Sequence, residues 1–507
     1  LVASAGKAKI DELDALYAAD PRAFGNYCQK DAELVFSIFG RTGLFRLTME
    51  RASLTGVSLD KAWTSVVSFE RIYGMELSRR NIAPDFPSAR DVSGAAGGTI
   101  LTPEPGFFSN VAVFDFRSLY PTIIRTFNID PLAHARAVDY AHSRTGSSGN
   151  AAGTAETITA PNEAVFLRTP GILPALIAEY FASRRGALEQ GDAIAGHVYK
   201  ILMNSFYGVL GTSSCRYGRT CLAGAITSFA RKWLLLSRDW FSREGYQVLY
   251  GDTDSLFVAS GLSDAASYDE FAAHCAGLAK NVNRFLSQSI HTEYGLESFL
   301  ELRFEKAYRR FIIPPLRSHR DGNDPGALKG RAKGYGGWII ARDGSCSVEV
   351  KGMEAVRRDT TELGRRLQLE LLELVFSGAG EERFLAHVRH AIAKLRAGGF
   401  DTDLVYRKRL SKPPESYTSS TPPQVKAARA LGWKGRRGTV EYVWTALGAE
   451  PASARKSPID YDHYIDAQIL PVAESIAQVM GWTKFSAGGK PRYRRGDFES
   501  GQMELEW

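Results

Sequence analysis

Two aspartates, Asp252 and Asp254, stand two positions apart in YGDTDSLFV (250–258), between residues that favour β-strands. Turns commonly contain aspartate, so a solvated turn is the simplest interpretation of this pair alone. A third carboxylate, Asp115, follows the apolar run VAVF near the end of another predicted strand. If the strand ends converge, the carboxylates raise one another's pKa, and cations between them relieve the repulsion. Oxygen ligands without His or Cys favour Mg²⁺, so two such ions and phosphoryl or nucleotidyl transfer are the predicted chemistry.

A third stretch, KILMNSFYGVLG (200–211), would add groups that hold a nucleotide. Lys200, Asn204 and Tyr207 recur at spacings of four and three, which places them on one face of an expected helix. Alone, this pattern is typical of an ordinary surface helix. Beside a metal site, the lysine would bind triphosphate oxygens and the tyrosine ring would pack against a base or sugar.

The elements that must position these groups can be predicted in outline. Residues 246–260 have strand-forming residues on both sides of Gly-Asp-Thr-Asp, which predicts a β-hairpin with the acids in its turn. Residues 170–206 are helical in pattern twice, with a break near Gly191, which predicts two antiparallel helices in a projecting hairpin. The chain beyond about Thr360 is mainly helical in pattern, is interrupted by basic loops expected at 406–412 and 433–439, and is expected to form a separate domain.

The composition is that of a folded protein with several domains. At 507 residues, with 44% hydrophobic and 23% charged residues, two to four domains are expected and disorder is not. No apolar run reaches the roughly 18 residues that span a bilayer, and no signal-peptide pattern is seen, so we expect no membrane partner and a cytoplasmic location. The five scattered cysteines favour buried free thiols over a disulfide or a zinc site.

The net charge of +7 suggests a polyanionic partner. Any single basic cluster is typical of a solvated face. Several clusters spread along the chain support a surface that follows phosphates, and they lie at 183–185, 303–311, 330–337, 405–414 and 433–439.

Three motifs in this order resemble the polymerase motifs of family B DNA polymerases. They are DFRSLYPTII (115–124), KILMNSFYG (200–208) and YGDTDS (250–255). The resemblance extends over essentially the whole chain, through VKGMEAVRRD (350–359), LVYRKRL (404–410) and SPIDYDHYIDAQILPVAE (457–474). Within the family, the amino-acid sequence of these motifs is similar to that of the bacterial DNA polymerase II group. This similarity implies a role in repair or translesion synthesis.

The resemblance implies a role for each matching residue. Asp115 and Asp254 would be the bridging metal ligands together with the Phe116 carbonyl, and Asp252 would be a supporting carboxylate, giving the catalytic set of three aspartates. The cofactor would be two Mg²⁺ ions, with Mn²⁺ as a substitute. The implied nucleotide-binding residues are Ser118, Leu119, Tyr120, Arg184, Lys200, Asn204 and Tyr207. The implied DNA-binding residues are Gly208, Thr253, Lys333, Tyr335, Lys351, Glu354, Arg357, Tyr406, Lys408 and Arg409.

Tyr120 matches the position at which a 2′-hydroxyl would clash, which implies deoxynucleotide substrates. Two departures from the family pattern stand out. Leu188 occupies a place where a lysine is usual, which would weaken nucleotide binding. The family's Lys-Lys-Arg-Tyr element reads AKGY (332–335), so two of its basic groups are missing.

The segment YCQKDAELV (27–35) resembles the last motif of the family's 3′–5′ exonuclease, with Tyr27 and Asp31 in its Tyr and Asp positions. That nuclease needs about four carboxylates for its own metal pair. The motifs that supply the others would precede residue 1. We therefore expect Asp31 to be an orphaned helix residue and this chain to lack proofreading. The ending QMELEW (502–507) is interpreted first as a frayed terminus, with a sliding-clamp peptide as the alternative.

The expected fold is a mixed α/β (α+β) right-hand polymerase with a palm β-sheet, a helical fingers hairpin and a mainly helical thumb. The predicted divisions are an exonuclease remnant (1–45), a connecting region (46–110), palm (111–165), fingers (166–207), palm (208–360) and thumb (361–507). The expected function is addition of dNTPs to a primer 3′-hydroxyl on a DNA template by a monomer in the bacterial cytoplasm, associated with the nucleoid.

Two other functions stay open at this point. One is a catalytically silent, polymerase-derived DNA-binding protein, although the three aspartates and Lys200 are all present. The other is an RNA polymerase or reverse transcriptase with the same two-metal chemistry. Tyr120 argues against an RNA polymerase. The sequence does not decide whether the enzyme is a reverse transcriptase.

Overall fold

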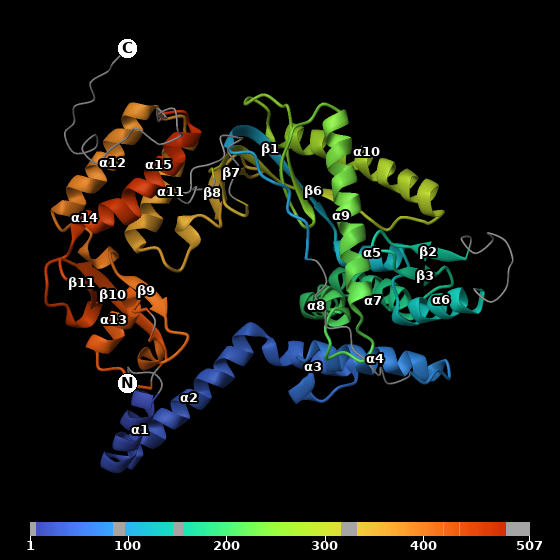
Figure 1. The fold of residues 1–507 in the computed structure, drawn as a ribbon, viewed down its shortest axis with the longest axis horizontal. Coiled ribbons are helices and arrows are strands. Elements are labelled where there is room, and N and C mark those ends of the chain that lie inside the picture. The colour runs from blue at the N-terminus through green and yellow to red at the C-terminus, as the bar shows by residue number, and fades with distance from the viewer. Residues whose placement is uncertain are drawn as a thin grey trace.

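The computed structural model describes residues 7–84, 97–144, 156–315, 332–418, 420–435 and 437–482. Figure 1 shows a central sheet with its helices, a helical group on one side and the C-terminal elements on the other, with the amino-terminal helices beneath. Among these residues, no helix combines the length and apolar character that crossing a membrane requires. The amino-terminal helices are α1 (Lys7–Ala19), α2 (Pro21–Thr42), α3 (Leu44–Thr55) and α4 (Ser65–Arg79).

The central sheet has six strands, all antiparallel to their neighbours, in the order β4-β5-β1-β6-β7-β8. The hairpin predicted around Gly-Asp-Thr-Asp is confirmed as β4 and β5, and Thr253 and Asp254 form its turn. The strands are β1 (Gly106–Phe116), β4 (Val248–Asp252), β5 (Ser255–Ala259), β6 (Leu302–Ile313), β7 (Tyr335–Ile340) and β8 (Cys346–Lys351).

The two faces of this sheet have different neighbours. Phe114 and Phe116 of β1 belong to a hydrophobic cluster that includes residues of α9 (Thr220–Arg243) and α10 (Tyr268–Tyr294). Val111 and Val113 belong to a second cluster, because successive side chains of a strand point to opposite faces. Asp115 continues the second row, so its carboxylate lies on the face away from these helices.

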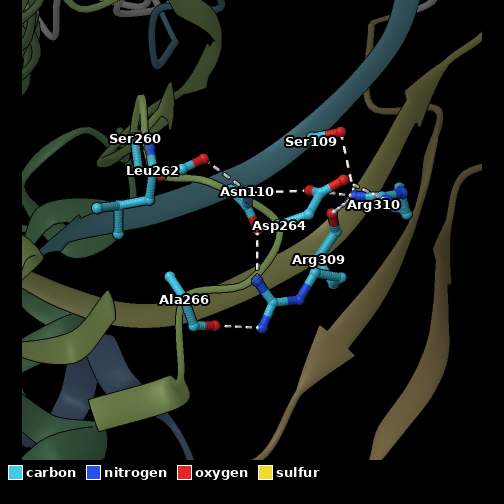
Figure 2. A network of polar contacts seen from close by, with 8 residues as sticks. All are labelled: Ser109, Asn110, Ser260, Leu262, Asp264, Ala266, Arg309 and Arg310. Atoms are coloured by element: carbon cyan, nitrogen blue, oxygen red, sulfur yellow. Dashed lines mark hydrogen bonds and ion pairs between the residues drawn. The ribbon is translucent and has the colours of Figure 1, made fainter. Parts of the chain in front are cut away.

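A polar network fixes the first half of β1 (Figure 2). The buried Asn110, with a φ of 51°, donates through its side-chain nitrogen to Asp264 Oδ1 at 3.1 Å. Arg309 on β6 donates to Asn110 Oδ1 at 2.9 Å, and Arg310 binds Asp264 through two hydrogen bonds of 2.6 and 2.8 Å. The network joins β1, β6 and the loop after β5, and so holds in place the strand that ends with the first aspartate.

The predicted helical hairpin is confirmed as α7 (Ile172–Glu189) and α8 (Ala193–Leu210), which pack against each other. Gly191 in the connection has a φ of 76°, a conformation that glycine adopts without strain. Asp192 caps α8 by accepting a hydrogen bond from the Ala195 amide at 3.0 Å. The second helix continues to Leu210, three residues beyond the predicted boundary at 207.

Smaller elements connect this hairpin to the sheet. They are α5 (Leu119–Thr126), α6 (Pro131–Arg144), β2 (Thr157–Thr159) and β3 (Val165–Leu167). Both α5 and α4 contact the hairpin helices, so α5 joins the end of β1 directly to α7 and α8.

The C-terminal elements have a hydrophobic cluster of their own. They are more mixed than the sequence indicated, because a three-stranded sheet in the order β11-β10-β9 accompanies the helices. The basic segment predicted as a loop is strand β9 (Tyr406–Arg409). The others are β10 (Thr439–Thr445), β11 (Gly448–Pro451), α11 (Glu362–Phe376), α12 (Glu381–Arg396), α13 (Pro423–Ala430), α14 (Tyr461–Tyr464) and α15 (Leu470–Val479). None of the five cysteines forms a disulfide; Cys215 and Cys275 are buried as predicted, whereas Cys28 is exposed and Cys221 and Cys346 are partly exposed.

Candidate active site

One cavity, of about 740 Å³, lies between the end of β1, helix α5 and the α7–α8 hairpin. Most of its lining residues were predicted as site residues from the sequence. They are Asp115, Phe116, Arg117, Ser118, Leu119, Tyr120, Pro121, Arg184, Leu188, Lys200, Asn204, Asp254 and Arg303.

Backbone contacts bring two of the predicted carboxylates together. Asp115 of β1 is the register partner of Ser255 of β5, and Ser255 Oγ donates to Asp115 Oδ1 at 2.6 Å. The same hydroxyl lies 3.5 Å from Asp254 Oδ1. The Phe116 amide donates to the Asp254 carbonyl at 2.9 Å, which ties the turn to the end of β1. Thr253 completes this turn with a φ of 59°.

The surroundings disfavour two negative charges at this place. Burial, followed by the charge of Asp115, raises the pKa of Asp254 to about 6. Burial also raises the pKa of Asp115, while the Ser255 hydroxyl and the charge of Lys200 oppose that shift. A cation between the two carboxylates would remove this cost, and an all-oxygen donor set suits Mg²⁺. The residues present therefore fit the expected metal.

Asp252 departs from the expected convergence of three carboxylates. The described residues include no group of three or more His, Cys, Asp or Glu that could hold a metal ion. Asp252 instead forms an ion pair with Lys333, with 3.2 Å between Oδ2 and Nζ. Asp252 nevertheless lines a neighbouring cavity together with Asp254, and its charge contributes to the raised pKa of Asp254, so its role as a supporting carboxylate stays a prediction. Two carboxylates face the cavity, and the third is neutralised beside it.

The opposite wall of the cavity is basic and aromatic. Lys200 and Asn204 of α8 and Arg184 of α7 line the same cavity as the two aspartates. Arg184 also donates from Nε to the Gly196 carbonyl at 3.2 Å and so connects α7 to α8. The cavity thus has carboxylates on the sheet side and cations on the hairpin side, which suits a triphosphate held by both.

Tyr120 lines the cavity, whereas the predicted Tyr207 is not among the lining residues and lies behind it in ring contact. The rings of Tyr120 on α5 and Tyr207 on α8 lie 4.4 Å apart between centroids, tilted by 43°. Burial raises the pKa of Tyr120 to about 12, so its hydroxyl stays protonated at neutral pH. The expected spacing of Lys200, Asn204 and Tyr207 along one helix face is thus realised in α8.

A sequence profile of DNA polymerase family B matches residues 72–314 and 327–480. The chain belongs to DNA polymerase family B. It is 36% identical over 482 residues to DNA polymerase II of Escherichia coli, covering 92% of this chain and 58% of that protein. It is 27% identical over 478 residues to DNA polymerase 2 of Aeropyrum pernix, covering 87% and 52%.

The fold supports the same membership. The structure of the family B DNA polymerase from the archaeon Pyrobaculum calidifontis superposes with a TM-score of 0.58 at 27% identity, covering 86% of this chain and 54% of that one. The chain therefore spans about half the length of the family B polymerases it matches.

The predicted DNA-binding residues of this family B chain lie outside the main cavity. Thr253, Lys333 and Tyr335 line a smaller cavity of about 360 Å³ on the other side of the hairpin turn. Glu354 and Arg357 line another of about 180 Å³, where Arg357 pairs with Asp359. The remaining predicted residues are Gly208 on α8, Lys351, which pairs with Glu349, and Lys408 and Arg409 on β9.

The placement of Tyr406 is a correction to the predicted DNA contacts. Its side chain is 6% exposed and its ring stacks on Tyr442 and Tyr464 at 5.2 and 5.6 Å. Its hydroxyl lies 3.1 Å from His463 Nε2. Because so little of this ring is accessible, Tyr406 stabilises the C-terminal core and does not offer a surface to DNA.

Three residues near the reacting groups have no role that the sequence alone predicts. Arg117 and Arg303 line the main cavity. Ser255 reaches the Asp115 carboxylate only because of the register between β1 and β5. The basic cluster at 303–311 was recognised but not assigned to the site. The register between distant strands, which decides the role of Ser255, has no sequence signal.

The two predicted exonuclease residues lie on α2, far along the chain from the cavity. Tyr27 is partly exposed and Asp31 is exposed, and α2 has no buried residue. The interpretation of Asp31 as an orphaned helix residue and the absence of proofreading both stay predictions. The QMELEW ending lies outside the described residues, as do Gly330 and Arg331 of one basic cluster and Arg436 of another.

Proposed function

We propose that this chain is the polymerase unit of a DNA-directed DNA polymerase, which adds dNTPs to a primer 3′-hydroxyl and releases pyrophosphate. The observation that carries the proposal is the pairing of Asp115 and Asp254 on one wall of a cavity whose other wall holds Arg184 and Lys200. This arrangement is the one that a metal-assisted transfer of a nucleotidyl group requires.

Asp115, Asp254 and the Phe116 carbonyl would hold the metal ions. Mg²⁺ held by these residues would supply positive charge that favours ionisation of the primer hydroxyl and offsets the charge of the triphosphate. The Ser255 hydroxyl fixes the direction of the Asp115 carboxylate through its hydrogen bond of 2.6 Å. The protein thus keeps one ligand in a single orientation before substrate arrives.

The basic wall would position the nucleotide. Lys200 and Arg184 would bind the phosphate oxygens, so that the α-phosphate lies toward the aspartates. Tyr120 would lie under the sugar, where a 2′-hydroxyl would collide with its ring, and Tyr207 supports that ring through a tilted contact at 4.4 Å. Leu188 would leave the phosphates with one cation fewer than the family pattern supplies.

We assign the six-stranded sheet with α9 and α10 as the palm, α7 and α8 as the fingers, and the elements from α11 onward as the thumb. Primer-template DNA would contact the thumb at Lys408 and Arg409 and would approach the palm at Lys333, Tyr335, Lys351, Glu354 and Arg357. A role in repair or translesion synthesis, contact with a sliding clamp, a monomeric state and a place near the bacterial nucleoid are proposals that rest on the family likeness.

The direct test is primer extension on a defined DNA template with dNTPs, with rNTPs and with no nucleotide in parallel. Extension with dNTPs alone is the expected result. Equal extension with rNTPs would favour an RNA polymerase, and binding of primer-template without any extension would favour the catalytically silent DNA-binding protein. The same reaction on an RNA template separates a reverse transcriptase from a DNA-templated enzyme.

A further inference from the structure

A second cavity lies beside the nucleotide cavity and shares a residue with it. It has a volume of about 380 Å³. Arg117 lines both cavities. The lining of the second cavity is Arg117, Thr122, Arg125, Ala178, Phe181, Ala182, Arg185, Phe299 and Glu301.

Helix α7 separates the two cavities. Arg184 and Arg185 are consecutive on this helix, where successive side chains project about 100° apart. Arg184 lines the first cavity and Arg185 lines the second. The two consecutive arginines therefore line two different cavities. Only Arg184 has a role in the proposed reaction.

The second cavity has an excess of positive charge. Three arginines line it against one carboxylate, Glu301, and this carboxylate is already bound outside the cavity by Arg303 through hydrogen bonds of 2.7 and 2.9 Å. Arg117 approaches Glu301 only at 3.4 Å. In the part of the chain that the structure describes, Arg125 and Arg185 form no ion pair.

Two of these arginines, Arg125 and Arg117, are held in place by further contacts that do not use a carboxylate, although the charge of Glu297 also acts on Arg125 and Arg117 keeps its 3.4 Å ion pair with Glu301. The Arg125 guanidinium lies 3.5 Å from the centroid of the Phe299 ring, a cation–π contact that leaves its charge intact. The Arg117 amide donates to the Glu301 carbonyl at 2.9 Å, which fixes the backbone of Arg117 at the junction of the cavities. Guanidinium groups bind phosphate oxygens with two parallel hydrogen bonds, so three of them on three elements suit a ligand with several phosphate oxygens.

We propose that this second cavity binds a polyphosphate anion, the chemistry shared by released pyrophosphate and by the triphosphate of a further nucleotide. The identification of the anion as pyrophosphate or a nucleotide triphosphate rests on the proposed function. The inference that an anion binds here rests on the three arginines that line the cavity. Arg117 connects the two cavities, so an anion leaving the nucleotide cavity reaches the second without losing contact with a guanidinium group.

The test measures binding of inorganic pyrophosphate to the polymerase complexed with a dideoxy-terminated primer, template, Mg²⁺ and saturating dNTP. Because the dNTP fills the first cavity, calorimetric binding of pyrophosphate reports a separate site. The variants are R185Q, which alters an exposed side chain, and R125Q. The matched control is R231Q, which removes an exposed arginine on α9 outside both cavities.

Pyrophosphate is expected to bind this complex, with about tenfold weaker binding in R185Q and in R125Q, as expected for a lost charge-assisted hydrogen bond. R231Q should bind as the unchanged protein does. Pyrophosphate binding that weakens in proportion to the dNTP concentration would show that both ligands compete for the first cavity and would overturn the proposal. An affinity of R185Q for pyrophosphate equal to that of R231Q would overturn it as well.

Further arms of the experiment identify the source of the anion. Titration with excess dNTP shows whether a second nucleotide binds with the same sensitivity to R185Q, and titration with inorganic phosphate shows whether a single phosphate is enough. Tight binding of phosphate alone would contradict a polyphosphate site. Failure of the unchanged protein to extend a primer would instead refute the proposed function, so the two failures are distinguishable.

Discussion

Replacing Ser255 by alanine should impair catalysis while leaving the fold and the nucleotide contacts in place. Ser255 Oγ donates to Asp115 Oδ1 at 2.6 Å and lies 3.5 Å from Asp254 Oδ1, and it has no contact with Lys200 or Arg184. A hydrogen bond to a charged group contributes about 1.5–3 kcal/mol, which corresponds to a reduction of about 10- to 100-fold in kcat.

The assay is single-nucleotide extension under single-turnover conditions, over a range of dNTP and Mg²⁺ concentrations. We expect kcat to fall, the Mg²⁺ requirement to rise and the KM for dNTP to change little, because the phosphates contact the opposite wall. S255T, which keeps the hydroxyl, should recover most of the rate. S263A, at an exposed loop position, is the matched control. A rate for S255A within about twofold of the unchanged protein would refute the orienting role, because that corresponds to less than 0.5 kcal/mol.

Three further predictions concern the neighbouring residues. Y120A should admit ribonucleotides, measured as the ratio of kcat/KM for dNTP and rNTP, whereas Y120F keeps the ring and should keep the discrimination; an unchanged ratio in Y120A would argue against the steric role. D252A should reduce kcat by less than about tenfold, because Asp252 forms a partly exposed ion pair with Lys333 and such pairs contribute about 1 kcal/mol or less; a loss equal to that of an Asp254 variant would contradict this. Pure protein with Mg²⁺ and no nucleotide should leave a mismatched primer end intact on a sequencing gel, and shortening of that primer would show that the chain proofreads.

The local elements of this site were predictable from the sequence. The hairpin around Asp252 and Asp254 follows from strand-forming residues flanking turn residues, and the α7–α8 hairpin follows from two helical patterns broken at Gly191. Local propensity decides such elements. The family motifs then identified residues on both walls of the cavity.

Contacts between distant segments were not predictable. The pairing of Asp252 with Lys333 joins residues 81 positions apart and depends on the left-handed conformation of Lys333, with a φ of 59°. The partnership of Ser255 with Asp115 depends on the register of β5 against β1. Both are decided by packing of the whole sheet, for which a single sequence gives no signal.

The nature of β9 was missed for a related reason. The strongly basic composition of Tyr406–Arg409 favours a loop, yet Tyr406 is buried in a stack with Tyr442 and Tyr464. Tertiary packing of one ring overrides the local polarity of its neighbours. The same burial removes Tyr406 from the proposed DNA-binding surface, whereas Lys408 and Arg409 remain accessible on the strand.

The most direct test of the central claim compares D254A with D139A, which changes an exposed aspartate on α6. Primer extension and affinity for primer-template duplex are measured for both variants under the same conditions. D254A should bind the duplex as the unchanged protein does and should not extend the primer, whereas D139A should do both. Extension by D254A at the rate of D139A would contradict the assignment of Asp115 and Asp254 as the catalytic pair.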